Sequence, residues 1–137
     1  MGGRSGQNIG GQNDQNKLQN ATNKLNSLPN GKIFDDAKSI VGIFDKSERS
    51  WSEVIEAYEK NQQNAIQQVV DVRNIHITQP NIQSGKVIDI MKNIENVPIV
   101  NVVQFENGEM AIYDGHHRVT ANYLLGDYKL LVNIVKL

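Results

Sequence analysis

The sequence predicts an α+β fold, a small mixed sheet with flanking helices, preceded by N-terminal helices and a flexible polar tail. The length of 137 residues suits one ordinary domain with a tail. The second half of the chain alternates β-branched patterns of strand type with apolar patterns of helix type. An Asn-Gly pair at residues 107–108 stands between two apolar runs, which favours an antiparallel hairpin.

Residues 1–30 are predicted to be a flexible linker. They contain 5 Gly, 7 Asn and 4 Gln, and such a composition cannot bury enough apolar surface to offset the entropy lost on ordering. Leu18, Leu25 and Leu28 fall near heptad spacing and leave an alternative open, a weak helical turn or a contact with a partner.

Residues 31–68 are predicted to form a helical N-terminal extension. Apolar residues recur every three or four positions over residues 33–45, which indicates a short amphipathic helix. Ser50 and Glu53 form a potential capping box at the start of a second helix, whose apolar stripe fades towards Val69. We expect this stripe to belong to the core rather than to a ligand site.

Residues 69–137 are predicted to form the main domain. Each expected element is marked by apolar periodicity, by a helix cap or by a turn dipeptide. The expected elements are a strand over 69–77 that ends at 78–80, a helix over 86–94 capped by Ser84, a hairpin of 99–105 with 110–113, a helix over 118–125 closed by Gly126, and a strand over 129–136.

Charge and composition exclude several classes of protein. With 14 Lys and Arg against 15 Asp and Glu, the formal net charge of −1 gives no field that would draw the whole molecule to nucleic acid or to an anionic membrane. The absence of cysteine excludes disulfides, thiolate metal sites and a cysteine nucleophile. No apolar run approaches the ~18 residues of a membrane-spanning helix, and residues 1–11 lack the apolar segment of a signal peptide. We therefore expect a soluble protein without membrane insertion.

The segment Asp114-Gly115-His116-His117-Arg118 is the strongest candidate for a functional site. It joins an expected strand to an expected helix, where main-chain N–H groups and the positive end of the helix dipole converge. Glycine removes the Cβ that would block an anion, Arg118 offers a fork for phosphate, and the histidines offer adjustable donors. We expect one histidine to face the ligand and the other to brace the loop. Asp114 can accept a hydrogen bond from a substrate hydroxyl, hold a water or bind Mg²⁺.

Each of these residues also has a structural interpretation. An Asp-Gly at a strand end is often only a turn, a histidine can be a satisfied structural residue, and Arg118 can simply pair with Asp114. A zinc site has little support, because the adjacent histidines and the distant His76 lack the spacing of a ligand set. The residue types alone leave the functional and structural interpretations open.

The stretch from Asn74 to the C-terminus, 64 of the 137 residues, resembles the ParB/sulfiredoxin superfamily. The matching pieces occur in the same order as in that superfamily. They are a strand with a Gln-Pro turn at 75–80, a helix over 86–94, a hairpin that opens at 98–100, and a Gly-x-x-Arg loop within 112–118. The resemblance implies a ParB-like domain that binds a nucleotide at this loop.

The resemblance also implies which residues hold the phosphates of a nucleoside triphosphate such as ATP. By position these are Gly115, His117 and Arg118, together with Thr78 and Gln79 of the Gln-Pro turn. We expect Mg²⁺ to accompany the nucleotide.

Candidate catalytic residues follow from the same comparison. A related free-serine kinase carries an Asp-Gly-His-Thr-Arg version of the loop, which makes Asp114 a candidate catalytic carboxylate and metal ligand. We add His116, His117 and Arg118 as candidate catalytic residues.

Differences between this sequence and the family's motifs argue against two of the family's activities. His116 stands where sulfiredoxins have their nucleophilic cysteine, and Asn81 stands where ParB proteins have an arginine. The chain also ends about twenty residues after the loop, without a helix-turn-helix. We therefore expect neither sulfinic acid repair nor chromosome segregation. The loop is also similar to ParB-like domains at the C-terminal ends of secreted polymorphic toxins and in phage proteins.

The expected function is hydrolysis or transfer of the terminal phosphate of a nucleoside triphosphate, as the toxic domain of a secreted bacterial effector with a cognate immunity protein as a partner. Such a domain would be cytoplasmic or delivered into a target cell within a larger protein. One alternative is a ParB-like nuclease acting on DNA or RNA, although residues 71–137 hold 6 basic and 7 acidic side chains, which favours a small nucleotide over a long strand. Another is a non-catalytic nucleotide-binding or interaction module.

Overall fold

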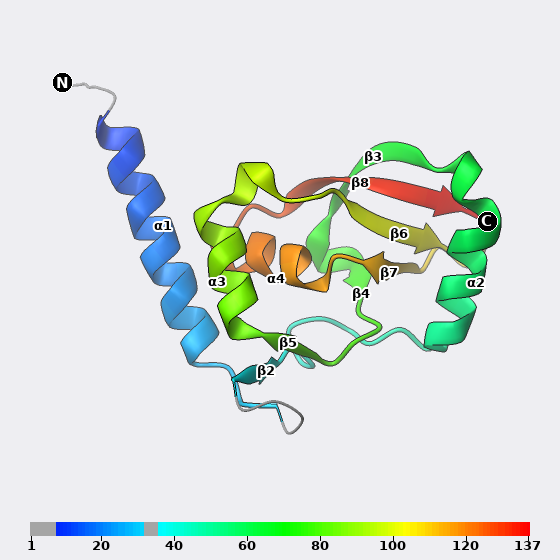
Figure 1. Cartoon of the computed structure of the whole chain (residues 1–137), viewed down its shortest axis with the longest axis horizontal. Coiled ribbons are helices and arrows are strands. Elements are labelled where there is room, and N and C mark those ends of the chain that lie inside the picture. Colours follow the sequence, from blue (N-terminus) through cyan, green and yellow to red (C-terminus); the bar gives the residue numbers. More distant parts are fainter. Residues whose placement is uncertain (1–7, 32–35) are drawn as a thin grey trace.

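The computed structural model describes residues 8–31 and 36–137 (Figure 1). The helices are α1 (Asn8–Asn26), α2 (Trp51–Asn61), α3 (Ser84–Lys92) and α4 (His116–Leu125). The strands are β2 (Ala37–Ser39), β3 (Ile66–Asp71), β4 (Ile75–His76), β5 (Asn81–Gln83), β6 (Val100–Gln104), β7 (Met110–Asp114) and β8 (Lys129–Lys136). Short 3₁₀ turns lie at Gln62–Asn64, Val72–Asn74 and Ile94–Asn96.

A mixed five-stranded sheet with the order β3-β8-β6-β7-β4 is the framework of the fold. β3 is antiparallel to β8, and β6 is antiparallel to β7. β8 is parallel to β6, and β4 is parallel to β7. β2 and β5 form a separate antiparallel pair. Because β4 and β7 are parallel neighbours, the loops that follow them leave the sheet at the same edge, and this brings the Gln-Pro turn beside the loop at residue 115.

Helices cover both faces of the sheet. Val102 and Ile112 belong to the main core, which α1, α3 and α4 complete. Val103 and Ala111, their neighbours in the strands, point to the opposite face and pack with Val54 of α2. Side chains alternate between the faces of a strand, so adjacent residues serve different cores. Figure 1 shows α1, α3 and α4 gathered on one side and α2 apart from them.

The predicted α+β class is confirmed, and so are several elements of the main domain. The hairpin β6-β7 turns at the predicted Asn-Gly pair, and β8 spans the predicted residues 129–136. The helix predicted over residues 86–94 is present as α3, two residues earlier. The predicted cap at Ser84 is wrong, because Ser84 is the first residue of α3 and its hydroxyl donates to the carbonyl of Asp36 at 2.8 Å. Gly126 ends α4 in the left-handed conformation with φ 79°. Ser50 and Glu53 make the predicted capping box at the start of α2.

The predicted linker is wrong for the part of residues 1–30 that the structure describes, because Asn8–Asn26 form α1. Ala21 and Leu25 of α1 are fully buried in the main core. Lys17 also makes an ion pair with Asp127 beyond α4, at 2.8 Å. Tertiary packing thus orders a segment whose composition disfavours a helix. Residues 1–7 lie outside the described residues.

The helix predicted over residues 33–45 is also wrong, and residues 32–35 of it lie outside the described residues. Residues 37–39 form β2, which pairs with β5, and the N–H of Ile40 donates to the carbonyl of Pro80 at 3.0 Å. Ile40 and Phe44 are buried as the pattern implies. Long-range strand pairing therefore buries the apolar residues that the periodicity assigned to a helix.

The strand predicted over residues 69–77 is divided into β3, a 3₁₀ turn and β4. Asp71 causes the break, because its side chain accepts the N–H of Arg73 at 2.9 Å and also binds the Arg73 guanidinium. The helix predicted from residue 118 begins two residues earlier, at His116. Within the described residues, no helix is both long and apolar enough to cross a membrane.

Candidate functional site

A groove of about 570 Å³ lies at the edge of the sheet where β7 passes into α4. This volume is typical of small-molecule sites. Its lining comes from the turn after β4, from the first turns of α2 and α3, and from the loop that opens α4. The lining residues are Trp51, Thr78, Gln79, Pro80, Lys86, Tyr113, Asp114, Gly115, His116 and His117.

Gly115 makes the abrupt change from strand to helix. It has φ 118°, a conformation that side-chain-bearing residues rarely adopt. A Cβ at this position would lie 2.8 Å from Cγ2 of Val100 in β6. The sequence predicts a glycine that allows the close approach of an anion, and the structure adds that this position has no room for a side chain against the sheet.

His116 is a buried, hydrogen-bonded residue with 6% of its surface exposed. Its Nε2 accepts the main-chain N–H of Thr78 at 3.0 Å and that of Gln79 at 3.1 Å. Burial, and to a smaller extent the charge of His117, lower the pKa of His116 to about 4. The imidazole is therefore neutral at pH 7 with Nε2 unprotonated, and it fastens the turn after β4 to the start of α4.

His117 makes a second link of the same kind. Its Nε2 accepts the N–H of Gln83, the last residue before α3, at 3.1 Å. Burial lowers the pKa of His117, the positive charge of Lys86 lowers it further, and Asp114 opposes the shift. Both rings thus use Nε2 to hold the main chain, whereas the sequence analysis expected one ring to face a ligand. These bonds agree with the structural interpretation of the histidines, while both rings still line the groove.

Arg118 lies outside the groove. Its Nε donates to Oδ1 of Asn122 at 2.9 Å, and its guanidinium reaches the carbonyl of Val97 at 3.4 Å. It lines a separate hollow next to Ile99 and Leu131. The Arg118 guanidinium, the predicted phosphate-binding group, therefore does not line the groove. Among the ion pairs of the described residues, none joins Arg118 to Asp114.

The other predicted residues do line the groove. Asp114 is exposed at the end of β7. Burial raises the pKa of Tyr58, and the hydrogen bond to Glu59 raises the pKa of Tyr113, with the charge of Asp114 as a smaller cause in both. The hydroxyl of Thr78 donates to the carbonyl of Ile112, so this side chain is engaged within the fold. Nε2 of Gln79 donates to the carbonyl of Asn81.

Two groove residues were missed by the sequence analysis. Lys86 in the first turn of α3 provides the positive charge that Arg118 does not bring. Trp51, the first residue of α2, is exposed and lines the groove. Its capping box was recognised, but a position on an amphipathic helix does not reveal which distant loop it faces. A single tryptophan directly after a helix cap is the only signal that pointed to this residue.

The described residues contain no cluster of three or more His, Asp or Glu side chains arranged to hold a metal ion. Asp114 is the carboxylate that lines the groove. One carboxylate with substrate phosphates is a common environment for Mg²⁺, so Asp114 fits the predicted ion only if phosphates complete the ligand set.

Fold and groove together define a small α+β domain with a polar groove at the N-terminus of α4. No model of a known protein family matches the chain, and no curated protein matches it either.

Proposed function

We propose that the groove binds a nucleoside triphosphate with its phosphates at the N-terminus of α4. The observation that carries this proposal is the convergence of that N-terminus with Lys86 in one groove. The first N–H groups of a helix have no partner within the helix, and the helix dipole adds positive potential there. Phosphate is the ligand that such a terminus binds best, and a lysine adds the charge that a polyphosphate requires.

Turnover of the terminal phosphate is the activity that this groove supports best. Asp114 lies next to the amides and can orient a water or an acceptor hydroxyl for attack on the terminal phosphorus, while the bond to the bridging oxygen breaks. Lys86 would balance the charge that develops on the phosphate oxygens. Mg²⁺, held by Asp114 and the phosphates, would supply further charge neutralisation.

The experiment compares Lys86→Gln with Lys92→Gln, which removes a second exposed lysine in the last turn of the same helix. The wild type should gain thermal stability with one of ATP, GTP or CTP and Mg²⁺, because a ligand at 100 times its Kd stabilises by about 2.7 kcal/mol. Lys86→Gln should lose most of this shift and Lys92→Gln should keep it. If none of the three nucleotides shifts the wild type at millimolar concentration, nucleotide binding is refuted.

Phosphate release by the wild type and by Asp114→Asn then separates turnover from binding. Hydrolysis predicts that the variant still binds nucleotide but no longer releases phosphate. The second candidate function, a binding module without catalysis, is favoured by the histidine and Arg118 contacts, which leave Asp114 and Lys86 as the groove's free charged groups. Binding without phosphate release from the wild type would establish that alternative.

The proposed role as the toxic part of a secreted effector has its own test. Expression inside a bacterial host should arrest growth for the wild type and not for Lys86→Gln. Normal growth of cells that accumulate folded wild-type protein would contradict this role while leaving nucleotide binding intact.

A further inference from the structure

Trp51 is the only tryptophan of the chain; the residue is 46% exposed and lines the groove. The ring is stacked against Tyr113 of β7, with centroids 6.0 Å apart and an interplanar angle of 28°. Tyr113 is stacked in turn on Tyr58 of α2, with centroids at 4.1 Å and an angle of 10°. The three rings form a continuous aromatic stack, and Trp51 at its end lines the same groove as Asp114 and Lys86.

Hydrogen bonds hold the two tyrosines of this aromatic stack in place. The hydroxyl of Tyr58 donates to Asn101 at 3.0 Å, and that of Tyr113 donates to Glu59 at 3.1 Å. Trp51 is therefore stacked on tyrosine rings whose hydroxyl groups are fixed by hydrogen bonds. A large apolar ring that remains partly exposed at the wall of a polar groove is available to a ligand.

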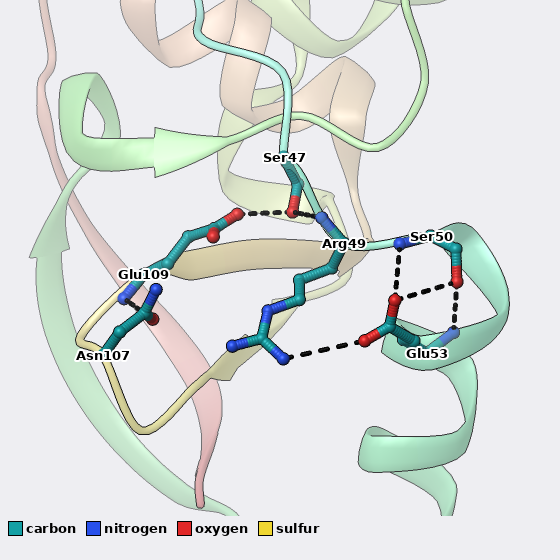
Figure 2. Close-up of polar contacts among 6 residues, drawn as sticks. All are labelled: Ser47, Arg49, Ser50, Glu53, Asn107 and Glu109. Carbon is teal, nitrogen blue, oxygen red and sulfur yellow. Dashed lines mark hydrogen bonds and ion pairs between the residues drawn. The ribbon is translucent and has the colours of Figure 1, made fainter.

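A network just before Trp51 fixes the start of α2, as Figure 2 shows. The N–H of Glu53 donates to the hydroxyl of Ser50 at 3.2 Å, and the Glu53 carboxylate accepts the N–H of Ser50 at 3.2 Å. Arg49 pairs with Glu53 at 3.6 Å and also lies over the ring of Phe105, 4.3 Å from its centroid. The position of Trp51 is thus set by contacts that do not involve the groove.

The same network joins the segment before α2 to the hairpin. Ser47 is buried, and its hydroxyl donates to the carboxylate of Glu109 next to β7. The hydroxyl also accepts the N–H of Arg49 at 3.1 Å. Glu109 directly precedes β7 and Asp114 is its last residue, so this strand connects the contact of Ser47 to the carboxylate of the groove. Their relative position is therefore set before any ligand binds.

We propose that Trp51 is the platform on which the base of the nucleotide stacks, so that the groove recognises a planar aromatic group in addition to phosphate. This inference rests on the proposed function and specifies the ligand class further. The phosphates lie at the start of α4 and beside Lys86, and the base lies on the Trp51 ring at the same groove. Stacking does not read hydrogen-bonding edges, so the platform favours purines through their larger ring rather than selecting one base.

The experiment measures binding of ATP, CTP and inorganic triphosphate, each with Mg²⁺, by calorimetry. In the wild type, ATP should bind about tenfold more tightly than inorganic triphosphate, which is the size of one base–aromatic stack. CTP should fall between them. Trp51→Ala should reduce ATP binding to the level of inorganic triphosphate, whereas Trp51→Phe should retain most of the difference. Ser52→Ala, which changes the next exposed residue of α2, should bind like the wild type.

Fluorescence gives an independent readout, because Trp51 is the only source of tryptophan emission. ATP should quench the wild-type emission with the same Kd as in calorimetry, and inorganic triphosphate should bind without quenching. Equal affinities of ATP and inorganic triphosphate, or full ATP affinity in Trp51→Ala, would overturn the platform and leave phosphate binding intact. If neither ligand binds the wild type, the proposed function fails and the platform fails with it.

Discussion

Acidification should destabilise the fold through His116, whose imidazole accepts two main-chain N–H groups in its neutral form. Its pKa is about 4 in the folded protein against 6.5 for the unperturbed side chain. The unfolded chain therefore binds a proton at a higher pH than the folded chain does. The contribution of the neutral imidazole is complete above pH 6.5 and is lost as the pH falls towards 4.

The size of the effect follows from the shift. A difference of 2.5 pH units between 6.5 and about 4 corresponds to about 3 kcal/mol, at 1.36 kcal/mol for each unit. Midway through this interval the free energy of unfolding should change by about 1.4 kcal/mol per pH unit because of His116 alone. His117, whose pKa is lowered in the same direction, adds to the slope.

Urea denaturation between pH 7.5 and 4.5 measures this slope for the wild type and for His116→Gln. The glutamine amide oxygen can accept the same N–H groups but does not titrate. The free energy of unfolding of the variant should therefore change with pH by about 1.4 kcal/mol per unit less than that of the wild type. Parallel stability curves for the wild type and His116→Gln would refute the assignment of a buried, neutral His116.

Three further substitutions test how the site is built, all by urea denaturation. Gly115→Ala should cost about 2–4 kcal/mol, because it adds a steric overlap to backbone strain. Gly108→Ala, at a positive φ with open space, should cost only the strain, and equal losses would contradict the overlap. Leu25→Ala should cost about 2–4 kcal/mol if α1 is packed on the core, with the exposed Asn23→Ala as a neutral control. Ser50→Ala should cost about 1 kcal/mol through loss of the helix cap, and no loss would mean that α2 is held without it.

The features that the sequence predicted correctly depend on a few neighbouring residues. The hairpin needs only Asn107 and Gly108 between apolar runs, and α4 ends where Gly126 can adopt a positive φ. The start of α2 needs only Ser50 and Glu53. Turn and cap chemistry is local, so it can be recognised without knowledge of the tertiary structure.

The features that were mispredicted depend on distant partners. Leu25 orders α1 by packing in the main core, and the residues near it in the sequence do not predict this packing. Residues 37–39 become a strand because β5 is available to pair with them. Over residues 33–45 the local pattern correctly marked buried apolar residues such as Ile40, but tertiary contacts decided the backbone conformation.

The position of Arg118 was predictable in principle from the helix boundary. Successive residues of an α-helix are rotated by about 100°, so a side chain two positions after His116 points to nearly the opposite side. A helix that begins at Arg118, as the sequence predicts, would leave this side chain with the loop. Because α4 begins at His116, the guanidinium instead reaches Asn122 one turn later.

The two histidines that look catalytic in the sequence give the groove its shape. His116 holds the turn that carries Thr78, and His117 holds the residue before α3, where Lys86 is located. Removing either ring eliminates a candidate catalytic group and also breaks hydrogen bonds that hold part of the groove wall. A histidine variant that loses nucleotide binding therefore bears on the chemistry of the site only if its free energy of unfolding is unchanged. Lys86→Gln does not have this ambiguity, because the lysine is exposed and its removal leaves these hydrogen bonds in place.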